Sequence, residues 1–360
     1  MRAVRAAIIG AGRPRRSPGA TGFGMAYNHA EGFVAAEGCE LVAVADIKRG
    51  NAEAFAEQYP SARPYEDYGE MLEREKPDIV SICLWTHLHR PAVSDCVGAG
   101  VKAIHCEKPM AATYGEARRM VEAADEAGVQ LTFNHQQRFG EAFREGKRLM
   151  DEGEIGEPVR FEAAYNDLLD SGTHSIDMMF KYNDQTPVEW VIGQIDCRTE
   201  GGYFGVQRED QSLSQFRFAN GVDAILATGD GAGVIGCMFR VIGSKGVIEV
   251  GAGKPTEMKR LRIRRDDRCG WEEPPIGEDI SGPDMLVKAL TRAILDVIDA
   301  LKTGRRSELD CHNALQATEV VFAIYESSRR RARIDLPLTI DDSPFLSMLE
   351  AGEIGPKRKG

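Results

Sequence analysis

Short apolar runs alternate with amphipathic stretches over the first third of the chain, and this alternation constrains the fold more than any other feature of the sequence. The runs are rich in Val, Ile and Ala, as are parallel strands that are buried on both faces. They fall at residues 4–10, 40–46, 78–84, 101–106 and 129–134. Between them apolar residues recur at helical spacing, as in 114–128. Strands that alternate with helices predict an α/β fold, with a doubly wound parallel sheet of the Rossmann type over residues 1–133.

The pattern changes after this first domain. Several strand-like runs follow one another without long helices between them, and two long helical patterns come next, at about 283–303 and 309–332. Strands followed by helices predict an α+β domain with a largely antiparallel, open sheet, which we place at residues 134–340. The polar residues 341–360 are expected to form a flexible C-terminal tail.

The net charge and the spacing of the cysteines exclude several classes of protein. The formal net charge is −11, which argues against nucleic acid or an anionic membrane as a partner. No apolar run approaches the roughly 20 residues of a membrane span. The first apolar run begins at Val4, which leaves no room for a signal peptide. Eight scattered cysteines without a C-x-x-C pair favour free thiols in a reducing cytoplasm, and we expect neither a disulfide framework nor a metal site.

A glycine turn follows the first predicted strand. Gly10 and Gly12 open like the G-x-G-x-x-G loop that binds a dinucleotide, but the third glycine is missing from its expected place. Asp46 ends the second strand, where an acidic residue binds the ribose 2′-hydroxyl, yet it comes 36 positions after Gly10 instead of roughly 20. We therefore interpret residues 13–21 as a loop inserted into a working turn, with Ala26 taking the place of the third glycine.

The inserted loop 13–21 carries three arginines and two prolines. One interpretation is a solvated surface loop. The other is that Arg13, or one of the two arginines that follow it, lies over the phosphates of the cofactor or over a phosphate on the substrate. Asp46 would repel a 2′-phosphate and so favours NAD, while Lys48 and Arg49 just behind it keep NADP possible.

Polar and aromatic residues follow three of the predicted strands. The carboxyl ends of strands are where doubly wound sheets bind their ligands, so these residues are candidates for binding and catalysis. Those expected near the cofactor are Leu84, Trp85, Thr86, His89 and Glu107; Lys108 is a candidate for the crevice, and the candidates for the substrate are Asn134, His135, Gln137 and Arg138. Each also has a plainer interpretation, as a helix start, a surface lysine or loop scaffolding.

A second cluster lies in "LLDSGTHSIDMMF", where Asp170 and His174 are four positions apart. A carboxylate within reach of an imidazole can fix its tautomer and stabilise the imidazolium after proton uptake. The alternative is an ordinary helix start, with Asp170 as the cap and His174 half-buried.

Taken in order, these motifs resemble the Gfo/Idh/MocA oxidoreductase family. The resemblance rests on G-x-G, the strand-end Asp, "SICLWTHLH", "CEKP", "NHQQRF", "GEIGEPV" and "DSGTHSID", and it extends from about residue 4 to residue 336. It implies a tightly bound NAD or NADP, a sugar or polyol-type substrate, and a C-terminal sheet whose face often forms the subunit interface. A homodimer or homotetramer would follow from such an interface.

The same resemblance assigns catalytic roles. Lys108 matches the catalytic lysine of the family, Asp170 and His174 match its acid and histidine, and Pro109 falls where the family often has a cis-proline. His174 would be the general base, Lys108 would stabilise charge on the substrate oxygen, and Asp170 would orient the histidine. Trp85 departs from the family pattern, which commonly has a proline at this position.

Two alternatives remain open. One is an enzyme that uses bound NAD transiently to cleave a glycosidic bond. The other is a non-catalytic dinucleotide-binding regulator on the same fold, since a fold does not fix a function. The regulator predicts the loss of at least one of Lys108, Asp170 and His174, and all three are present.

Overall fold

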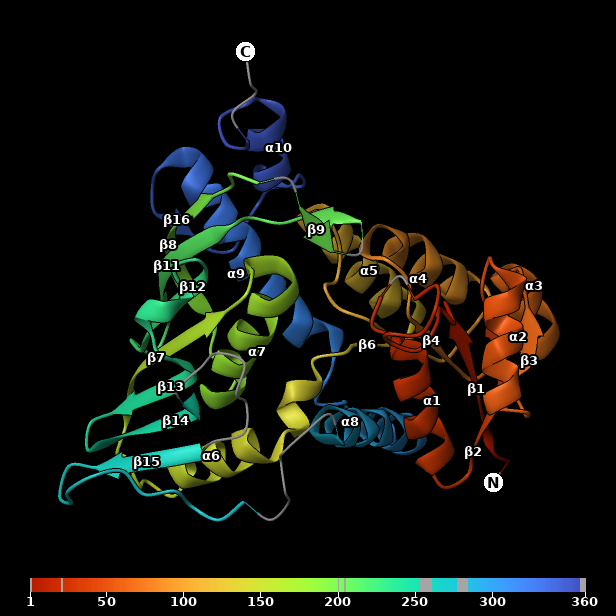
Figure 1. Cartoon of the computed structure of the whole chain (residues 1–360), viewed down its shortest axis with the longest axis horizontal. Coiled ribbons are helices and arrows are strands. Elements are labelled where there is room, and N and C mark those ends of the chain that lie inside the picture. The colour runs from red at the N-terminus through yellow and green to blue at the C-terminus, as the bar shows by residue number, and fades with distance from the viewer. Residues whose placement is uncertain are drawn as a thin grey trace. The chain divides into compact units, whose positions relative to one another are not determined.

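The computed structural model describes two compact units of the chain, and each is treated by itself (Figure 1). The described residues are 2–20, 22–199, 201–203, 205–252, 261–276 and 284–356. Unit 1 comprises Met1–Ala112, Glu116–Gln136 and Leu286–Leu315, and unit 2 comprises Thr113–Gly115, Gln137–Met285 and Gln316–Gly360.

Six parallel strands form the sheet of unit 1, in the order β3-β2-β1-β4-β5-β6. They are β1 (Val4–Ile9), β2 (Cys39–Ala45), β3 (Arg63–Tyr65), β4 (Ile79–Ile82), β5 (Ala103–Cys106) and β6 (Gln130–Phe133). This order is that of a Rossmann domain, so the predicted parallel sheet is confirmed. The sequence did not reveal β3, because it has only three residues and one is a proline.

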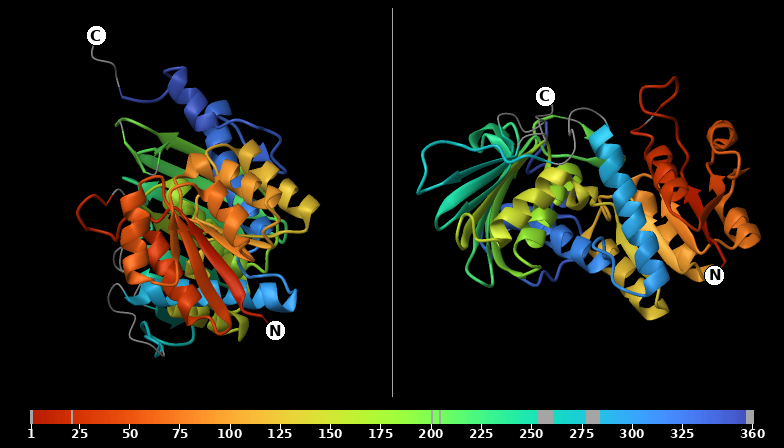
Figure 2. Two further views of the ribbon diagram at one scale, coloured as in Figure 1. Left: turned by 90° about the vertical axis from the view of Figure 1, so that its right-hand side faces the viewer. Right: turned by 90° about the horizontal axis from the view of Figure 1, so that it is seen from below.

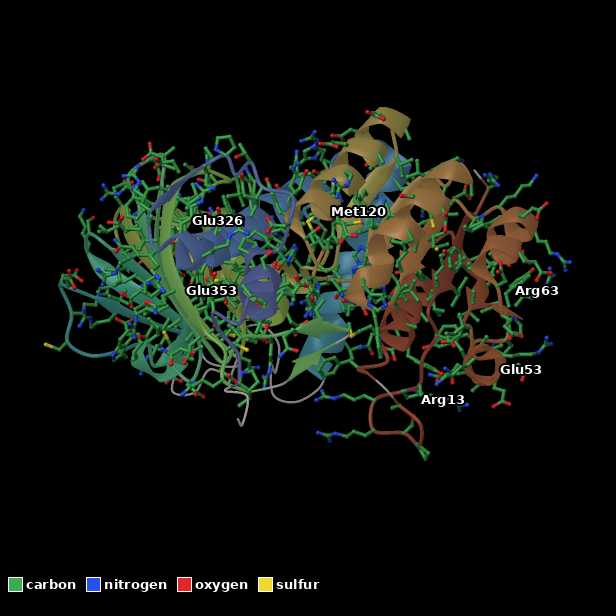
Figure 3. The ribbon with its side chains drawn as sticks, turned by 90° about the horizontal axis from the view of Figure 1, so that it is seen from above. Arg13, Glu53, Arg63, Met120, Glu326 and Glu353 are labelled. Atoms are coloured by element: carbon green, nitrogen blue, oxygen red, sulfur yellow. The ribbon has the colours of Figure 1, made fainter. Side chains whose placement is uncertain are left out.

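Helices cover both faces of this sheet (Figure 2). They are α1 (Met25–Ala35), α2 (Arg49–Gln58), α3 (Tyr68–Glu75), α4 (His89–Gly98), α5 (Tyr114–Ala127) and α8 (Asp284–Thr303). Side chains of α3, α4 and α5 share one core cluster, which includes Met120 of α5 (Figure 3).

Helix α8 packs against α1 and so belongs with unit 1. A Cβ at Gly32 of α1 would lie 2.6 Å from Cβ of Ile294 on α8, so the two helices meet through a glycine. The boundary drawn from the sequence at residue 133 gave α8 to the second domain. The structure differs there, because packing partners and not chain order decide which unit a helix joins.

Unit 2 is built on a sheet of eight strands, in the order β15-β14-β13-β7-β12-β11-β8-β16. The bounds are β7 (Pro158–Tyr165), β8 (Val188–Asp196), β11 (Gln211–Phe218), β12 (Asp223–Gly229), β13 (Cys237–Gly243), β14 (Gly246–Ala252), β15 (Leu261–Arg265) and β16 (Ile334–Asp335). A short hairpin of β9 (Gly202–Tyr203) and β10 (Val206–Gln207) stands apart from it. Strands β7 and β12 pair in parallel and the other neighbours are antiparallel, as predicted.

One face of this sheet carries the core of unit 2. Along β11 the side chains at Ser212, Ser214 and Phe216 are buried, whereas Leu213 and Gln215 between them are exposed. This alternation is typical of an antiparallel sheet that is covered on one side. The helices of the unit are α6 (Glu141–Asp151), α7 (Thr173–Tyr182), α9 (Cys311–Arg330) and α10 (Pro344–Glu350), and α6 and α7 lie along the sheet in Figure 1.

Residues 343–350, within the expected flexible tail, form a packed helix, which differs from the expectation. Ser343 caps α10, and Phe345 is 2% exposed and stacks on Tyr325 of α9 with ring centroids 5.3 Å apart. Residues 357–360 lie outside the described residues. All eight cysteines are described and none is disulfide-bonded, as the sequence predicted. Within the described ranges no helix is both long enough and apolar enough to cross a membrane.

Candidate active site

The turn after β1 has the backbone that a dinucleotide loop needs. Gly10 has a φ of +93°, and a Cβ there would lie 2.7 Å from the carbonyl oxygen of Cys83, so the position requires glycine. Gly12 has a φ of +56°, and apart from its two chain neighbours no described residue has an atom within 4 Å of the place its Cβ would take. The turn therefore presents bare backbone to open space, which suits the close approach of a pyrophosphate.

Asp46 lies against this turn despite its distance along the chain. Its Oδ2 accepts a hydrogen bond from the backbone N–H of Gly12 at 2.8 Å. Its Oδ1 accepts from the N–H of Lys48 at 2.8 Å and from Asn51 Nδ2 at 3.2 Å. The carboxylate thus stands at the end of β2 beside the second glycine, where a ribose hydroxyl is bound in dinucleotide-binding folds.

The inserted loop closes on itself between the glycine turn and α1. A Cβ at Gly24 would lie 2.6 Å from the carbonyl oxygen of Arg13, so the residue just before α1 returns to the start of the loop, and α1 begins only at Met25. Arg13 lies on the α2 side of the loop (Figure 3), where its Nε donates to Asn51 Oδ1 at 2.8 Å. Arg15 instead stacks over the ring of Phe23 at 4.7 Å. Arg13 is therefore the loop arginine held next to the Asp46 carboxylate.

The residues after β4 divide into a framework part and an exposed part. His89 is fully buried, and its ring nitrogens contact the carbonyl oxygens of Leu84 at 3.1 Å, Pro109 at 3.0 Å and Met110 at 3.2 Å. Burial lowers the pKa of this imidazole, so it is neutral at pH 7. His89 therefore ties two strand-end loops together.

Three neighbours of His89 differ in their exposure. Thr86 is also buried, Leu84 is half-buried, and Trp85 is 45% exposed. Trp85 is thus the most accessible of these residues, and His89 contributes by fixing the loops and not by facing solvent.

A buried ion pair, which the sequence did not reveal, underlies the loop after β5. His29 on α1 has 0% exposure, and its Nε2 lies 2.9 Å from Oε1 of Glu107. Its Nδ1 lies 2.5 Å from Oγ of Ser81, and Asn134 Nδ2 donates to the same Glu107 oxygen at 2.8 Å. The network joins α1 to the carboxyl ends of β4, β5 and β6.

The electrostatics of this network favour a charged pair. Burial lowers the pKa of His29, but interactions with Cys83 and Glu107 outweigh it and raise the pKa to about 10. Burial raises the pKa of Glu107, but the hydrogen bond and charge of His29 bring it down to about 2. An imidazolium and a carboxylate therefore face each other at neutral pH, immediately before Lys108.

Lys108 follows Glu107 and is half-buried. Its backbone N–H is 3.3 Å from Glu107 Oε2, and the Lys108–Pro109 peptide is cis, as the resemblance implied. Of the candidate substrate residues in unit 1, Asn134 belongs to the buried network and His135 is 2% exposed. The structure thus connects Lys108 to the residue before it and, through Glu107, to the sheet.

Asp170 and His174 lie on one continuous piece of backbone in unit 2. Residues Leu168–Gly172 form a π-helical turn that runs directly into α7. Asp170 is half-buried on this turn, and His174, in the first turn of α7, is 4% exposed. Asp167, which the sequence reading passed over, caps the turn: its Oδ1 accepts from the N–H groups of Asp170 at 2.7 Å and Ser171 at 3.2 Å.

Two candidate substrate residues in unit 2 have partners within the fold. Arg138 is 3% exposed and pairs with Asp177 of α7 through two of its guanidinium nitrogens, Nε to Oδ2 and Nη2 to Oδ1, each at 2.7 Å. Gln137 donates to the hydroxyl of Tyr165 at 3.3 Å. Arg138 therefore anchors α7, the helix that begins with His174.

Comparison with known proteins shows which proteins this chain is similar to. Residues 4–135 match the model of an oxidoreductase family described as having an NAD-binding Rossmann fold. D-apiose dehydrogenase of Paraburkholderia graminis is 24% identical over 91% of this chain and 91% of its own length. The first third of the chain, residues 4–135, therefore matches the Gfo/Idh/MocA oxidoreductase family.

Other comparisons agree with this match to the Gfo/Idh/MocA family. 1,5-anhydro-D-fructose reductase of Ensifer adhaerens is 31% identical, over 54% of this chain and 62% of that protein. The matches to several inositol dehydrogenases cover less than half of those proteins. A levoglucosan dehydrogenase, solved with NADH and levoglucosan, has the same fold, with a TM-score of 0.78 at 19% identity over 94% of this chain and all of that one.

Proposed function

We propose that the protein is an NAD-dependent dehydrogenase or reductase that transfers a hydride between the nicotinamide and a secondary alcohol or carbonyl group of a sugar, a polyol or a derivative of either. The observation that carries the proposal is the site in unit 1, where an open glycine turn, the Asp46 carboxylate and the loop of Lys108 all follow carboxyl ends of parallel strands. The named substrates of the relatives, D-apiose and 1,5-anhydro-D-fructose, are sugars and support the substrate class.

The side chains of the chain have complementary tasks in this reaction. His174 takes the proton of the substrate hydroxyl as general base, and Asp170 favours the imidazolium that results. Lys108 stabilises the negative charge that develops on the substrate oxygen. NAD, which the glycine turn and Asp46 would hold, would supply the acceptor for the hydride that the carbinol carbon loses on becoming a carbonyl carbon.

Screening with the purified protein tests the function. It is incubated with NAD and, in turn, with D-apiose, myo-inositol, levoglucosan and other polyols and sugars, and absorbance of reduced nicotinamide is followed. Net NADH formation with a free sugar or polyol is the expected result. Cleavage of a glycoside without net NADH would indicate transient oxidation instead, and tight NADH binding without turnover of any compound would indicate a regulator.

Asp46 is expected to set the preference for NAD over NADP. Its carboxylate would bind the ribose 2′-hydroxyl and repel a 2′-phosphate. Asp46→Asn keeps an acceptor for the Gly12 N–H but removes the charge, so NADH should bind about tenfold more weakly, as is usual when a hydrogen bond to a charged group is lost. Fluorescence titration with NADH and NADPH measures the ratio of the two dissociation constants, which should shift toward NADPH. Arg13→Ala is the companion variant and should weaken NADPH more than NADH; an unchanged ratio in both variants would refute these roles.

We propose further that the protein is a homo-oligomer, a dimer or tetramer, that assembles through the open face of the unit 2 sheet. Ile192 of β8 is 48% exposed and Leu213 of β11 is 54% exposed, and both lie on this face, opposite the core. Exposed apolar side chains on a sheet face are typical of an interface. The eight free thiols favour a reducing compartment such as the cytoplasm.

A charge on that face should dissociate the assembly. The variant Ile192→Asp/Leu213→Asp is expected to move the protein from an oligomer to a monomer in light scattering coupled to gel filtration. Glu40→Lys, on an exposed residue of β2 in unit 1, serves as the control for altered charge. A wild-type protein that is already monomeric at micromolar concentration would contradict the proposal.

A further inference from the structure

Two buried carboxyl groups stand behind the turn that carries Asp170. Asp167 is 2% exposed and directly precedes the turn, whereas Glu209 is 1% exposed and comes from the segment between β10 and β11. Neither belongs to the family motif from which Asp170 and His174 were identified. Acidic side chains are rarely buried so completely without a specific role, so both need an explanation.

Both carboxyl groups accept hydrogen bonds from the backbone of the same turn. Asp167 binds the N–H groups of Asp170 and Ser171 and, through Oδ2, the hydroxyl of Ser171 at 2.8 Å. Oε1 of Glu209 accepts a short hydrogen bond from the N–H of Leu168. The turn closes with the wide spacing of a π-helix, from the N–H of Gly172 to the carbonyl of Asp167 at 2.8 Å. The first N–H groups of a helix have no partners within it, and here the two carboxyl groups supply partners.

Glu209 also connects the turn to the rest of unit 2. Its Oε1 accepts from the hydroxyl of Thr228 on β12 at 3.2 Å, and its Oε2 accepts from the hydroxyl of Tyr325 on α9 at 3.0 Å. Glu209 therefore links Leu168 to the central strand β12 and to the long helix α9. A turn fixed to two rigid elements in this way holds its side chains in a narrow range of directions.

The charges around the pair make it sensitive to pH. Burial, and then the charge of Asp167, raise the pKa of Glu209 to about 7, and burial with the charge of Asp170 raises the pKa of Asp167. The other titratable groups that face Glu209 are the phenol of Tyr325 and the thiol of Cys197, and both are neutral at pH 7 because burial raises their pKa values. Above neutral pH two anions therefore share one buried region.

We propose that Glu209 and Asp167 are positioning residues, which hold the turn at 168–172 and through it set the direction of Asp170 and His174. The inference rests on the proposed function of Asp170 and His174. It predicts that the turn is held best while one of the two carboxyl groups carries a proton. When Glu209 ionises, repulsion from Asp167 loosens the turn and turnover declines on the alkaline side.

Two substitutions at Glu209 separate the hydrogen bond from the charge. Glu209→Gln keeps an acceptor for the N–H of Leu168 and removes the charge, so it imitates the protonated form at every pH. Glu209→Ala removes the acceptor and leaves the N–H of a buried turn unsatisfied. Glu319→Gln is the matched control. Glu319 lies on α9, and burial raises its pKa as it does that of Glu209, but it binds the N–H of Leu338 at 2.7 Å and not the turn.

The first measurement is hydrogen–deuterium exchange of the peptide that spans 166–173, corrected for the intrinsic pH dependence of exchange, and it needs no substrate. Glu209→Ala should lose at least about tenfold protection in this peptide and retain it in α9, because only the turn opens locally. In the wild type protection should fall between pH 6 and pH 8, and in Glu209→Gln it should stay level. Unchanged protection in Glu209→Ala, or an equal loss throughout unit 2, would overturn the inference.

The second measurement is the pH profile of kcat for the sugar or polyol that the screen identifies. Glu209→Ala should lower kcat about 10- to 100-fold with an unchanged dissociation constant for NADH, which is typical of misplaced catalytic groups. Glu209→Gln should equal the wild type at pH 6.5 and lack its decline above pH 7, while Glu319→Gln should follow the wild-type profile. A wild-type profile in all three variants would overturn the inference.

The variant Asp170→Asn shows whether a negative result contradicts the positioning role of Glu209 or the proposed function itself. If Asp170→Asn is inactive while the Glu209 variants match the wild type in exchange and in pH profile, the positioning role is wrong and the proposed function stands. If Asp170→Asn turns over at the wild-type rate, the proposed function of Asp170 is wrong, and with it the inference that the turn serves catalysis.

Discussion

Replacing Lys108 by alanine is expected to lower kcat by about 100- to 1,000-fold, the usual cost of removing a donor that stabilises developing charge on oxygen. The affinity for NADH should change little, because the carboxylate beneath the loop, Glu107, keeps its partners His29 and Asn134 in the variant. Stopped-flow or steady-state turnover with the sugar or polyol found by the screen gives kcat, and a fluorescence titration gives the dissociation constant of NADH. The two numbers together separate chemistry from binding.

Lys102→Ala is the matched control for this variant. Lys102 precedes the opposite end of the same strand, β5, and its side chain is 61% exposed in an ion pair with Asp78 at 2.9 Å. Its loss should leave kcat within about twofold, because an exposed ion pair contributes little. A wild-type kcat in Lys108→Ala would show that the lysine has no role in the chemistry. A parallel loss of NADH affinity would show that it binds cofactor instead.

The parallel sheet was predictable because each of its longer strands is buried on both faces and therefore reads as a continuous apolar run. The late start of the first helix, at Met25, was predictable for a different reason. Asp46 ends a strand, so the excess of chain between it and Gly10 had to lie outside the regular elements, and the structure brings Asp46 within 2.8 Å of Gly12. The position of Asp46 at the end of its strand thus indicated how the chain returns to Gly12 after the extra residues.

Other features could not be read from the sequence, because they depend on which surfaces meet. The periodicity of α8 shows an apolar face but not that Ile294 on this face packs against Gly32. His29 lies among apolar residues of a helix without any spacing that relates it to Glu107, which is 78 positions away. Glu209 comes from a segment with little regular structure, and only the folded sheet brings it to the turn of Asp170. Charged groups of this kind are found from coordinates, because their partners are distant in sequence.

The variant His29→Leu is expected to lower the free energy of unfolding by about 3–5 kcal/mol near pH 6, the usual cost of removing one member of a buried ion pair. Leucine would leave the carboxylate of Glu107, 7% exposed, without its cationic partner. Urea unfolding followed by fluorescence and circular dichroism measures the loss. The double variant His29→Leu/Glu107→Gln should recover much of it, because no buried charge then remains uncompensated.

The pH dependence of this loss follows from the two pKa values. The pKa of His29 rises from its ordinary 6.5 to about 10 on folding, so its contribution is complete below pH 6.5 and is lost as pH rises toward 10. The pKa of Glu107 falls from 4.5 to about 2, so its contribution is complete above pH 4.5 and is lost as pH falls toward 2. The stability difference between wild type and His29→Leu should therefore be largest between pH 4.5 and 6.5 and should shrink on both sides.

His312→Gln is the control, since it removes a histidine that also pairs with carboxylates but at the surface. His312 contacts Asp310 at 2.7 Å and Asp125 at 3.1 Å with 39% of its side chain exposed, so its loss should cost no more than about 1 kcal/mol. If His29→Leu unfolded at the same urea concentration as the control, the pair would contribute no net stability. If the loss were as large at pH 10 as at pH 6, the stabilisation would come from packing of the ring, and the buried imidazolium would not be its cause.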